Sequence, residues 1–170
     1  MAREPEAWLR GPVAGIPPLL MPAAHALIQA REDTAAALAS TTRERLWARP
    51  GASASAGFHL IHLAGALERL YTYARGAELD AAQTERLARE RRGDDATLSP
   101  AAVGAIVDRA VELALEQLAS TPEASLLEIR VVGRARLPAT VAGLLFHGAE
   151  HATRHVGQCV TVLKALETAS

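Results

Sequence analysis

The stretch His147-Gly-Ala-Glu-His151-Ala-Thr-Arg-His155-Val-Gly-Gln158 holds half of the six histidines in the chain, spaced four residues apart. On an α-helix, residues four positions apart lie one above the other on the same face. Two imidazoles in that arrangement can bind one metal ion, with ring nitrogens about 2.0–2.1 Å from zinc. The simpler interpretation is three structural histidines on a half-buried helix. An i, i+4 pair, with further histidines elsewhere in an alanine-rich chain, favours a metal site instead.

The composition predicts a single all-α domain over residues 1–170. Hydrophobic residues make up 49 % of the chain but aromatic residues only 4 %, so the core must consist mainly of alanine, leucine and valine. Alanine and leucine are strong helix formers, and β-branched residues cluster in few places. The length suits one domain with a core of its own.

Charge and cysteine content exclude several classes of protein. A net charge of −1 gives no indication of a nucleic-acid or acidic-membrane partner. Cys159 is the only cysteine, so an intrachain disulfide is impossible. The charged N-terminal residues lack the apolar segment of a signal peptide, and no apolar run approaches the roughly 20 residues of a membrane span. We therefore expect a cytoplasmic protein.

Four long amphipathic segments are expected to form helices, and four helices with one apolar face each indicate a four-helix bundle. The segments begin at a proline pair, after a capping serine, at a Ser-Pro pair and after a proline. In chain order they cover residues 17–40, 55–75 (capped by Ser53 or Ser55), 99–121 and 138–167.

Two connections break the helical pattern. Residues 77–98 are polar and highly charged, with a short helix expected from Asp80 to Arg92, and their charges are interpreted as a solvated surface of a linker or lid. Residues 126–137 contain the only β-like patch, and Gly133 and Pro138 keep it short. This second connection is predicted to be an extended crossover or a small hairpin before the last helix.

A third metal ligand is expected from the second long helix, which carries His59 and His62. Catalytic zinc sites usually have three protein ligands and an open position. Residues three apart rarely both point at one ion, and His62 lies at a depth comparable to His151. The predicted triad is therefore His62, His151 and His155, with ring nitrogens about 3–4 Å apart. His25 and His147 are left as wall residues, although His25 would be the one to close a structural tetrahedral shell.

Two hydrolase patterns compete with this interpretation. His147-Gly-Ala-Glu-His151 fits H-x-x-E-H, the motif of inverted zinc peptidases, in which Glu150 would be the general base. Only 19 residues follow His151, and their sole acid is Glu167. The segment after the motif therefore offers few residues that could supply the further metal ligand expected for this pattern. Cys159 lies one turn past His155 with no separate base beside it, and is interpreted as a small core residue rather than a nucleophile.

The sequence resembles the DinB-like (damage-inducible) superfamily over most of its length. The most specific part is Glu150-His151-x-x-x-His155-x-Gly157-Gln158. Further similarity lies in Gly57-Phe-His-Leu-Ile-His62-Leu-Ala-Gly65 and in Trp8-Leu-Arg-Gly-Pro12 leading into Pro17-Pro-Leu-Leu and Gln29-Ala-Arg-Glu-Asp33. The resemblance implies an up-down-down-up four-helix bundle, often dimeric. It also implies a zinc or nickel triad whose positions fall on His62, His151 and His155.

The resemblance further implies a metal-dependent enzyme, most often a thiol S-transferase that uses bacillithiol, mycothiol or glutathione, or a hydrolase. The expected partners are a low-molecular-weight thiol, a small electrophile or thiol adduct, and a second copy of the chain. Glu150 is a candidate proton acceptor, and Arg69, Tyr73 and Gln158 are candidate cofactor-binding residues. The alternative is a non-catalytic metal-binding module for stress response or dimerisation. The motif indicates the metal and leaves the substrate open.

Overall fold

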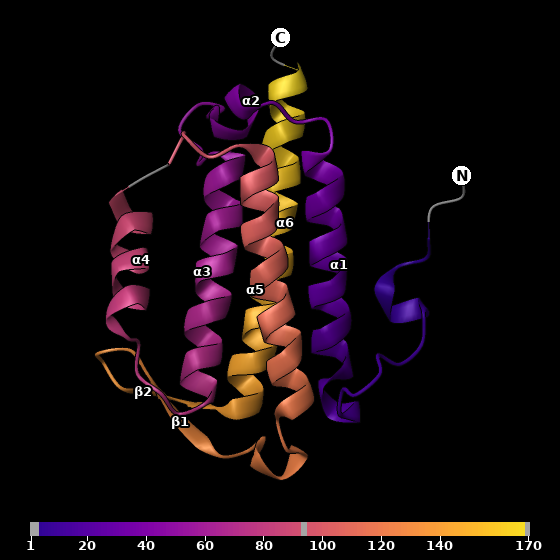
Figure 1. Cartoon of the computed structure of the whole chain (residues 1–170), viewed down its shortest axis with the longest axis vertical. Coiled ribbons are helices and arrows are strands. Elements are labelled where there is room, and N and C mark those ends of the chain that lie inside the picture. Colours follow the sequence, from indigo (N-terminus) through magenta and orange to yellow (C-terminus); the bar gives the residue numbers. More distant parts are fainter. Residues whose placement is uncertain (1–3, 93–94, 169–170) are drawn as a thin grey trace.

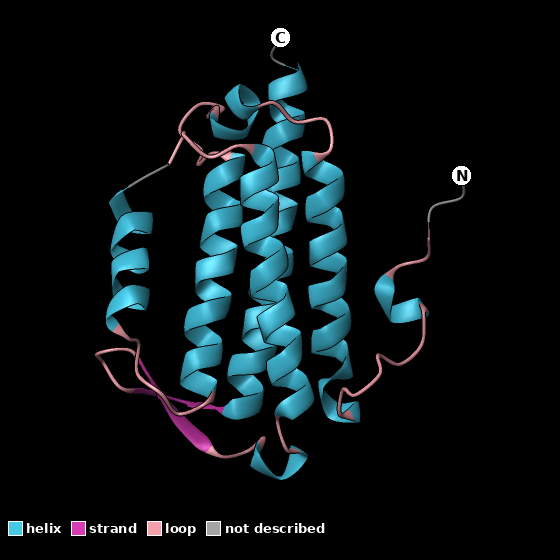
Figure 2. Ribbon diagram, in the orientation of Figure 1, coloured by secondary structure: helices cyan, strands magenta, loops and turns pink. Residues whose placement is uncertain are grey.

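The computed structural model describes residues 4–92 and 95–168, and apart from loops and one small two-stranded hairpin these residues are helical (Figures 1 and 2). The four predicted long helices are present, and the all-α expectation is confirmed. They are α1 (Met21–Leu38), α3 (Ala56–Ala74), α5 (Pro100–Ser120) and α6 (Val141–Thr168). The shorter elements are α2 (Arg43–Trp47), α4 (Ala81–Arg92), and the 3-10 turns η1 (Ala7–Leu9), η2 (Pro18–Leu20) and η3 (Glu123–Ser125).

Local capping explains where the long helices begin. Of the two serines proposed to start the second long helix, Ser55 is the cap, and its hydroxyl accepts a hydrogen bond from Phe58 N at 3.0 Å. Ser99 caps α5 in the same way through Ala102 N at 3.2 Å, with Pro100 in the first turn. Such caps satisfy amide groups that have no partner within the helix. At the other end of α3, Gly76 adopts a φ of +75° that favours glycine.

The four long helices lie side by side around one hydrophobic core (Figure 1). Helices α3 and α1 each pack against both α5 and α6. The centre of the core is formed by fully buried leucine and valine side chains: Leu27, Leu60, Leu63, Leu67, Leu118, Leu145, Val103, Val107 and Val111. No helix among the described residues is long and apolar enough to span a membrane.

The two connections take different forms. Strands β1 (Ile129–Val132) and β2 (Leu137–Thr140) pair antiparallel, so the segment before α6 is a hairpin rather than an extended crossover. Arg130 of β1 donates from Nε to the carbonyl of Ala74 at 2.9 Å, which ties the hairpin to the end of α3. Helix α4 lies on the outer side of α3, at the edge of the molecule (Figure 1).

Candidate metal centre

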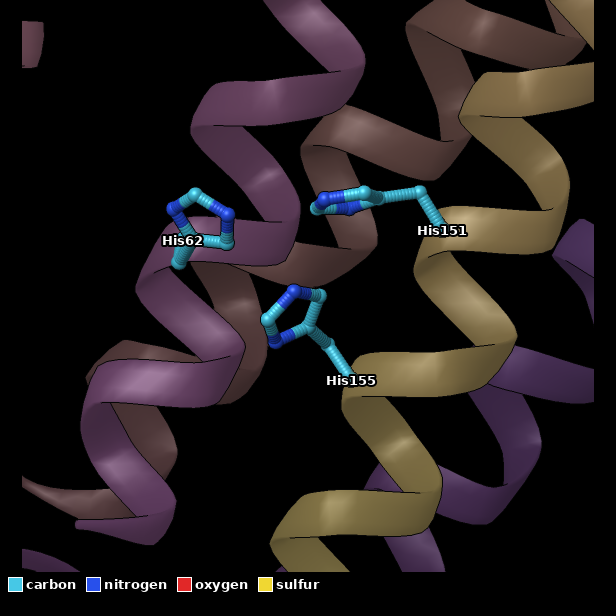
Figure 3. Close-up of side chains that lie close together, drawn as sticks. All are labelled: His62, His151 and His155. Atoms are coloured by element: carbon cyan, nitrogen blue, oxygen red, sulfur yellow. The ribbon is translucent and has the colours of Figure 1, made fainter. Parts of the chain in front are cut away.

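Three histidine side chains from two helices converge at one point between α3 and α6 (Figure 3). His62 comes from α3, and His151 and His155 come from successive turns of α6. One ring nitrogen of each lies within 4.8 Å of the other two, and the ring centroids are 4.4–5.1 Å apart. A tetrahedral ion with bonds of about 2.1 Å needs nitrogens about 3.4 Å apart, so modest ring movement would close the site. The upper bound of 4.8 Å is wider than the 3–4 Å expected from the sequence.

Close packing of α3 on α6 brings these side chains within reach of one another. Gly148 lies on α6 less than one turn before His151, and a Cβ at this position would meet Cε2 of Tyr71 at 2.7 Å. The Tyr71 hydroxyl donates to the carbonyl of Leu145 at 3.2 Å, again across the two helices. A missing side chain on α6 therefore leaves room for a ring from α3, and the two backbones approach closely.

The hydrogen bonds around the rings leave ligand nitrogens facing the cluster. His62 Nδ1 is hydrogen-bonded to Glu90 Oε1, and His155 Nδ1 to His59 Nδ1 at 3.1 Å. Nε2 of each ring is then the nitrogen left for a ligand. Nδ1 of His151 is buried and has no hydrogen-bond partner among the described residues. An unsatisfied buried polar atom is unfavourable, and a bound cation is one way to satisfy it. The residues present therefore fit a metal ion.

The electrostatic environment keeps His151 and His155 in the form that binds metals. Burial, together with the nearby His62, lowers the pKa of His151 to about 4 and that of His155 to about 3. Both rings are neutral at pH 7, and a histidine must be neutral at its ligating nitrogen to bind a metal. Phe58 stacks on the His62 ring with centroids 5.6 Å apart and an interplanar angle of 8°, which restricts that ring further.

A carboxylate from α4 completes the surroundings of His62. Glu90 accepts from His62 through one oxygen and from Arg69 Nη1 at 3.0 Å through the other. Burial by itself would raise the pKa of Glu90, but the hydrogen bonds from His62 and Arg69 outweigh it, and the pKa is lowered. The Glu90 side chain is only 9 % exposed, so the expectation that the charges of residues 77–98 form only a solvated surface is wrong at this position.

The chain matches the sequence model of the DinB superfamily over residues 26–159. This chain belongs to the DinB superfamily. The matched segment contains His62, His151 and His155, together with Glu90. No curated protein matches the sequence.

The remaining predicted residues of this DinB-superfamily protein lie outside the cluster. Glu150 is half exposed on α6, where its carboxylate pairs with His147 Nδ1 at 3.1 Å and with the Arg154 guanidinium. These partners place it in a surface ion-pair network, and it is not among the three residues that could share an ion. His25 is also elsewhere, because its Nε2 contacts the carbonyl of Gly11 at 2.9 Å and fastens the N-terminal segment to α1.

The three candidate cofactor-binding residues have different surroundings. The Arg69 guanidinium forms an ion pair with the Glu90 carboxylate. Tyr73 packs against the core, eleven residues after His62, which is about 16 Å along a helix. Gln158 is exposed on α6. The structure therefore brings Arg69 close to the cluster through Glu90, and leaves Tyr73 about three turns away along α3.

Proposed function

We propose that this protein is a metal-dependent enzyme of the DinB superfamily, in which His62, His151 and His155 bind one divalent ion, zinc or nickel. The four long helices would then be the up-down-down-up bundle implied by the family resemblance. The observation that carries the proposal is the convergence of three imidazoles on one point, with a buried nitrogen on His151 that has no partner among the described residues. Imidazole nitrogen is a preferred ligand for both metals.

Three ligands without a fourth favour catalysis over a purely structural ion. Structural zinc sites are closed by four protein ligands, whereas catalytic sites keep one position open. Among the described residues, no fourth histidine, cysteine, aspartate or glutamate joins the group of three. His25, the residue suggested to close the shell, contacts Gly11 instead.

The reaction we propose is thiol S-transfer to a small electrophile, or hydrolysis of a thiol adduct. An ion held by the triad would supply Lewis-acid chemistry, lowering the pKa of a thiol or water in its open position. The chain itself contributes the neutral imidazoles of His151 and His155 from α6. From α3 it contributes the His62 imidazole, which is oriented by its hydrogen bond to Glu90. Access of a small molecule to the ion is part of the proposal, and the partial exposure of His62 and His151 supports it. A cytoplasmic location, where low-molecular-weight thiols stay reduced, is part of the proposal.

The decisive first experiment is metal analysis of the purified protein, followed by a screen of low-molecular-weight thiols against a model electrophile. About one equivalent of zinc or nickel and thiol-dependent turnover are expected. Metal without activity on any thiol or hydrolysable adduct would favour the non-catalytic module. A protein that takes up no divalent ion would contradict the proposal altogether.

Two variants on α6 separate the triad from the inverted-peptidase pattern. His155→Ala removes a ligand, so metal occupancy and any activity should fall together. Glu150→Gln should keep the metal, because Glu150 pairs with His147 and Arg154 at the surface. The peptidase interpretation reverses this, since losing a general base costs on the order of 10²–10⁴ in rate. Metal content and turnover of the two variants are the measurements, and full occupancy in His155→Ala would exclude the triad.

A two-fold dimer is the proposed assembly. The proposal follows from the family resemblance and from the prevalence of two-fold dimers among soluble proteins. Light scattering coupled to size-exclusion chromatography should give about twice the chain mass of 17.9 kDa. A monomer at micromolar concentration would contradict it.

A further inference from the structure

A chain of contacts links α4 to the proposed metal ligand on α3. One oxygen of Glu90 accepts from His62 Nδ1, and the other accepts from Arg69 Nη1 at 3.0 Å. The side chains of Glu90 and Arg69 are 9 % and 13 % exposed, so this pair is largely shielded from water. The Glu90 carboxylate therefore accepts from Nδ1 of His62, whereas the other ring nitrogen, Nε2, faces the cluster.

We propose that Glu90 is a positioning residue that fixes His62 for metal binding, an inference that rests on the proposed metal site. A hydrogen bond from Nδ1–H to a carboxylate selects the tautomer whose Nε2 lone pair is free, and it sets the ring orientation. It also makes Nε2 a more basic ligand. His62 is the only one of the three ligands outside α6, so its orientation decides whether the third bond can form.

Gly65 makes this arrangement sterically possible. A Cβ at this position of α3 would lie 2.7 Å from both Arg69 Nη1 and Glu90 Oε2. Glycine is unfavourable inside a helix relative to alanine, so Gly65 does not contribute to the local stability of α3. Its absent side chain leaves the space in which the carboxylate of α4 reaches across α3 to His62.

A simple tether between α3 and α4 is the competing explanation, and a second, more exposed ion pair between the same helices serves as the control. Glu68 of α3 pairs with the Arg86 guanidinium of α4. This second ion pair joins the same two helices without contacting any histidine of the cluster. A variant of Glu68 therefore tests loss of an α3–α4 tether alone.

The experiment measures the dissociation constant of Co²⁺, by titration against a competing chelator, in the full-length protein and three variants. Glu90→Gln keeps the shape of the side chain but removes its charge. Gly65→Ala leaves both ionisable groups in place and displaces them. Glu68→Gln is the control. The visible absorption of bound Co²⁺ reports its ligand geometry, and thermal melting of the metal-free proteins reports the fold.

We expect Glu90→Gln to weaken Co²⁺ binding about 10–100-fold and to change the Co²⁺ spectrum. Gly65→Ala should weaken binding less, yet melt at the same or a higher temperature without metal, because alanine favours the helix and the displaced side-chain ends are flexible. Glu68→Gln should bind Co²⁺ like the unmodified protein. Weaker binding in Glu90→Gln and Gly65→Ala, with Glu68→Gln unchanged, would follow the contact between Glu90 and His62 and not an ion pair between α3 and α4 in general.

Equal Co²⁺ affinity in Glu90→Gln, Glu68→Gln and the unmodified protein would overturn the positioning role while leaving the metal site intact. Equal weakening in Glu68→Gln and Glu90→Gln would also overturn it, in favour of the tether. Failure of the unmodified protein to bind Co²⁺ would contradict the proposed function itself, and the inference with it. Failure of the inference alone is thus distinguishable from failure of the proposed function.

Discussion

The rings of His151 and His155 are neutral because of where they lie on α6. Burial and the neighbouring His62 hold the pKa of His151 at about 4 and that of His155 at about 3. In an unfolded chain each would have a pKa near 6.5. The folded state therefore disfavours protons at two positions that the unfolded state protonates readily below pH 6.5. Solvent screening at these half-buried rings reduces the size of the effect but not its sign.

The metal-free protein should lose stability as the pH falls below 6.5. Between the folded and unfolded pKa values the unfolded state binds more protons, so the free energy of unfolding rises with pH, and it levels off above about pH 7. Urea unfolding from pH 5 to 7.5 measures this slope in a window above the usual carboxylate pKa values. A double variant, His151→Asn with His155→Asn, is the control and should show a flatter profile. Equal slopes in the two proteins would contradict the assigned environments.

At the scale of elements, the contact between α3 and α6 depends on the absence of a side chain at Gly148. A Cβ there would meet the Tyr71 ring at 2.7 Å and Cδ2 of Leu67 at 3.3 Å. Tyr71 is buried, and its hydroxyl donates a hydrogen bond to the carbonyl of Leu145, so the ring cannot move aside easily. Gly157 lies on the same helix, and a Cβ there would meet no atom within 4 Å.

Gly148→Ala should therefore destabilise the protein while Gly157→Ala should not. Overpacking a well-packed interface typically costs about 1–3 kcal/mol, against a gain of up to about 1 kcal/mol from better helix propensity. Only the propensity gain applies at Gly157. Urea unfolding of both variants measures the difference, and the displaced α6 backbone should also weaken metal binding in Gly148→Ala. A Gly148→Ala protein as stable as Gly157→Ala would show that α3 and α6 are not in close contact at this point.

Local signals made the helices predictable, whereas long-range packing decided the rest. Ser55, the Ser99-Pro100 pair and Gly76 act on the adjacent backbone, so the sequence places those helix ends within one or two residues. The H-x-x-x-H spacing likewise predicts that His151 and His155 share a face. Glu90 was not predictable, because in sequence it is one charge among many. Only the docking of α4 on α3 buries it and brings it to His62.

At the scale of the whole fold, the hydrophobic core formed by the described residues includes none of the cluster histidines. The fully buried side chains at the centre are leucine and valine, whereas the cluster histidines are half-buried between α3 and α6. Folding therefore draws its main stabilisation from apolar burial that does not involve the cluster. A metal would add to the stability of an already folded chain, unlike in small domains whose folding free energy comes from the metal itself.

The protein should stay folded after treatment with a chelator and should melt at a higher temperature when zinc is restored. A ligand that binds only the folded state at 100 times its dissociation constant adds about 2.7 kcal/mol. For a chain of this length each kcal/mol raises the melting temperature by about 2–4 °C, so the expected shift is about 5–11 °C. His155→Ala, melted under the same conditions, should show little or none of it. A metal-free protein that is unfolded at room temperature would instead mean that the ion is structural, because the apolar core would then be insufficient without it. A folded protein whose melting temperature zinc leaves unchanged would mean that the three histidines do not act together as a site.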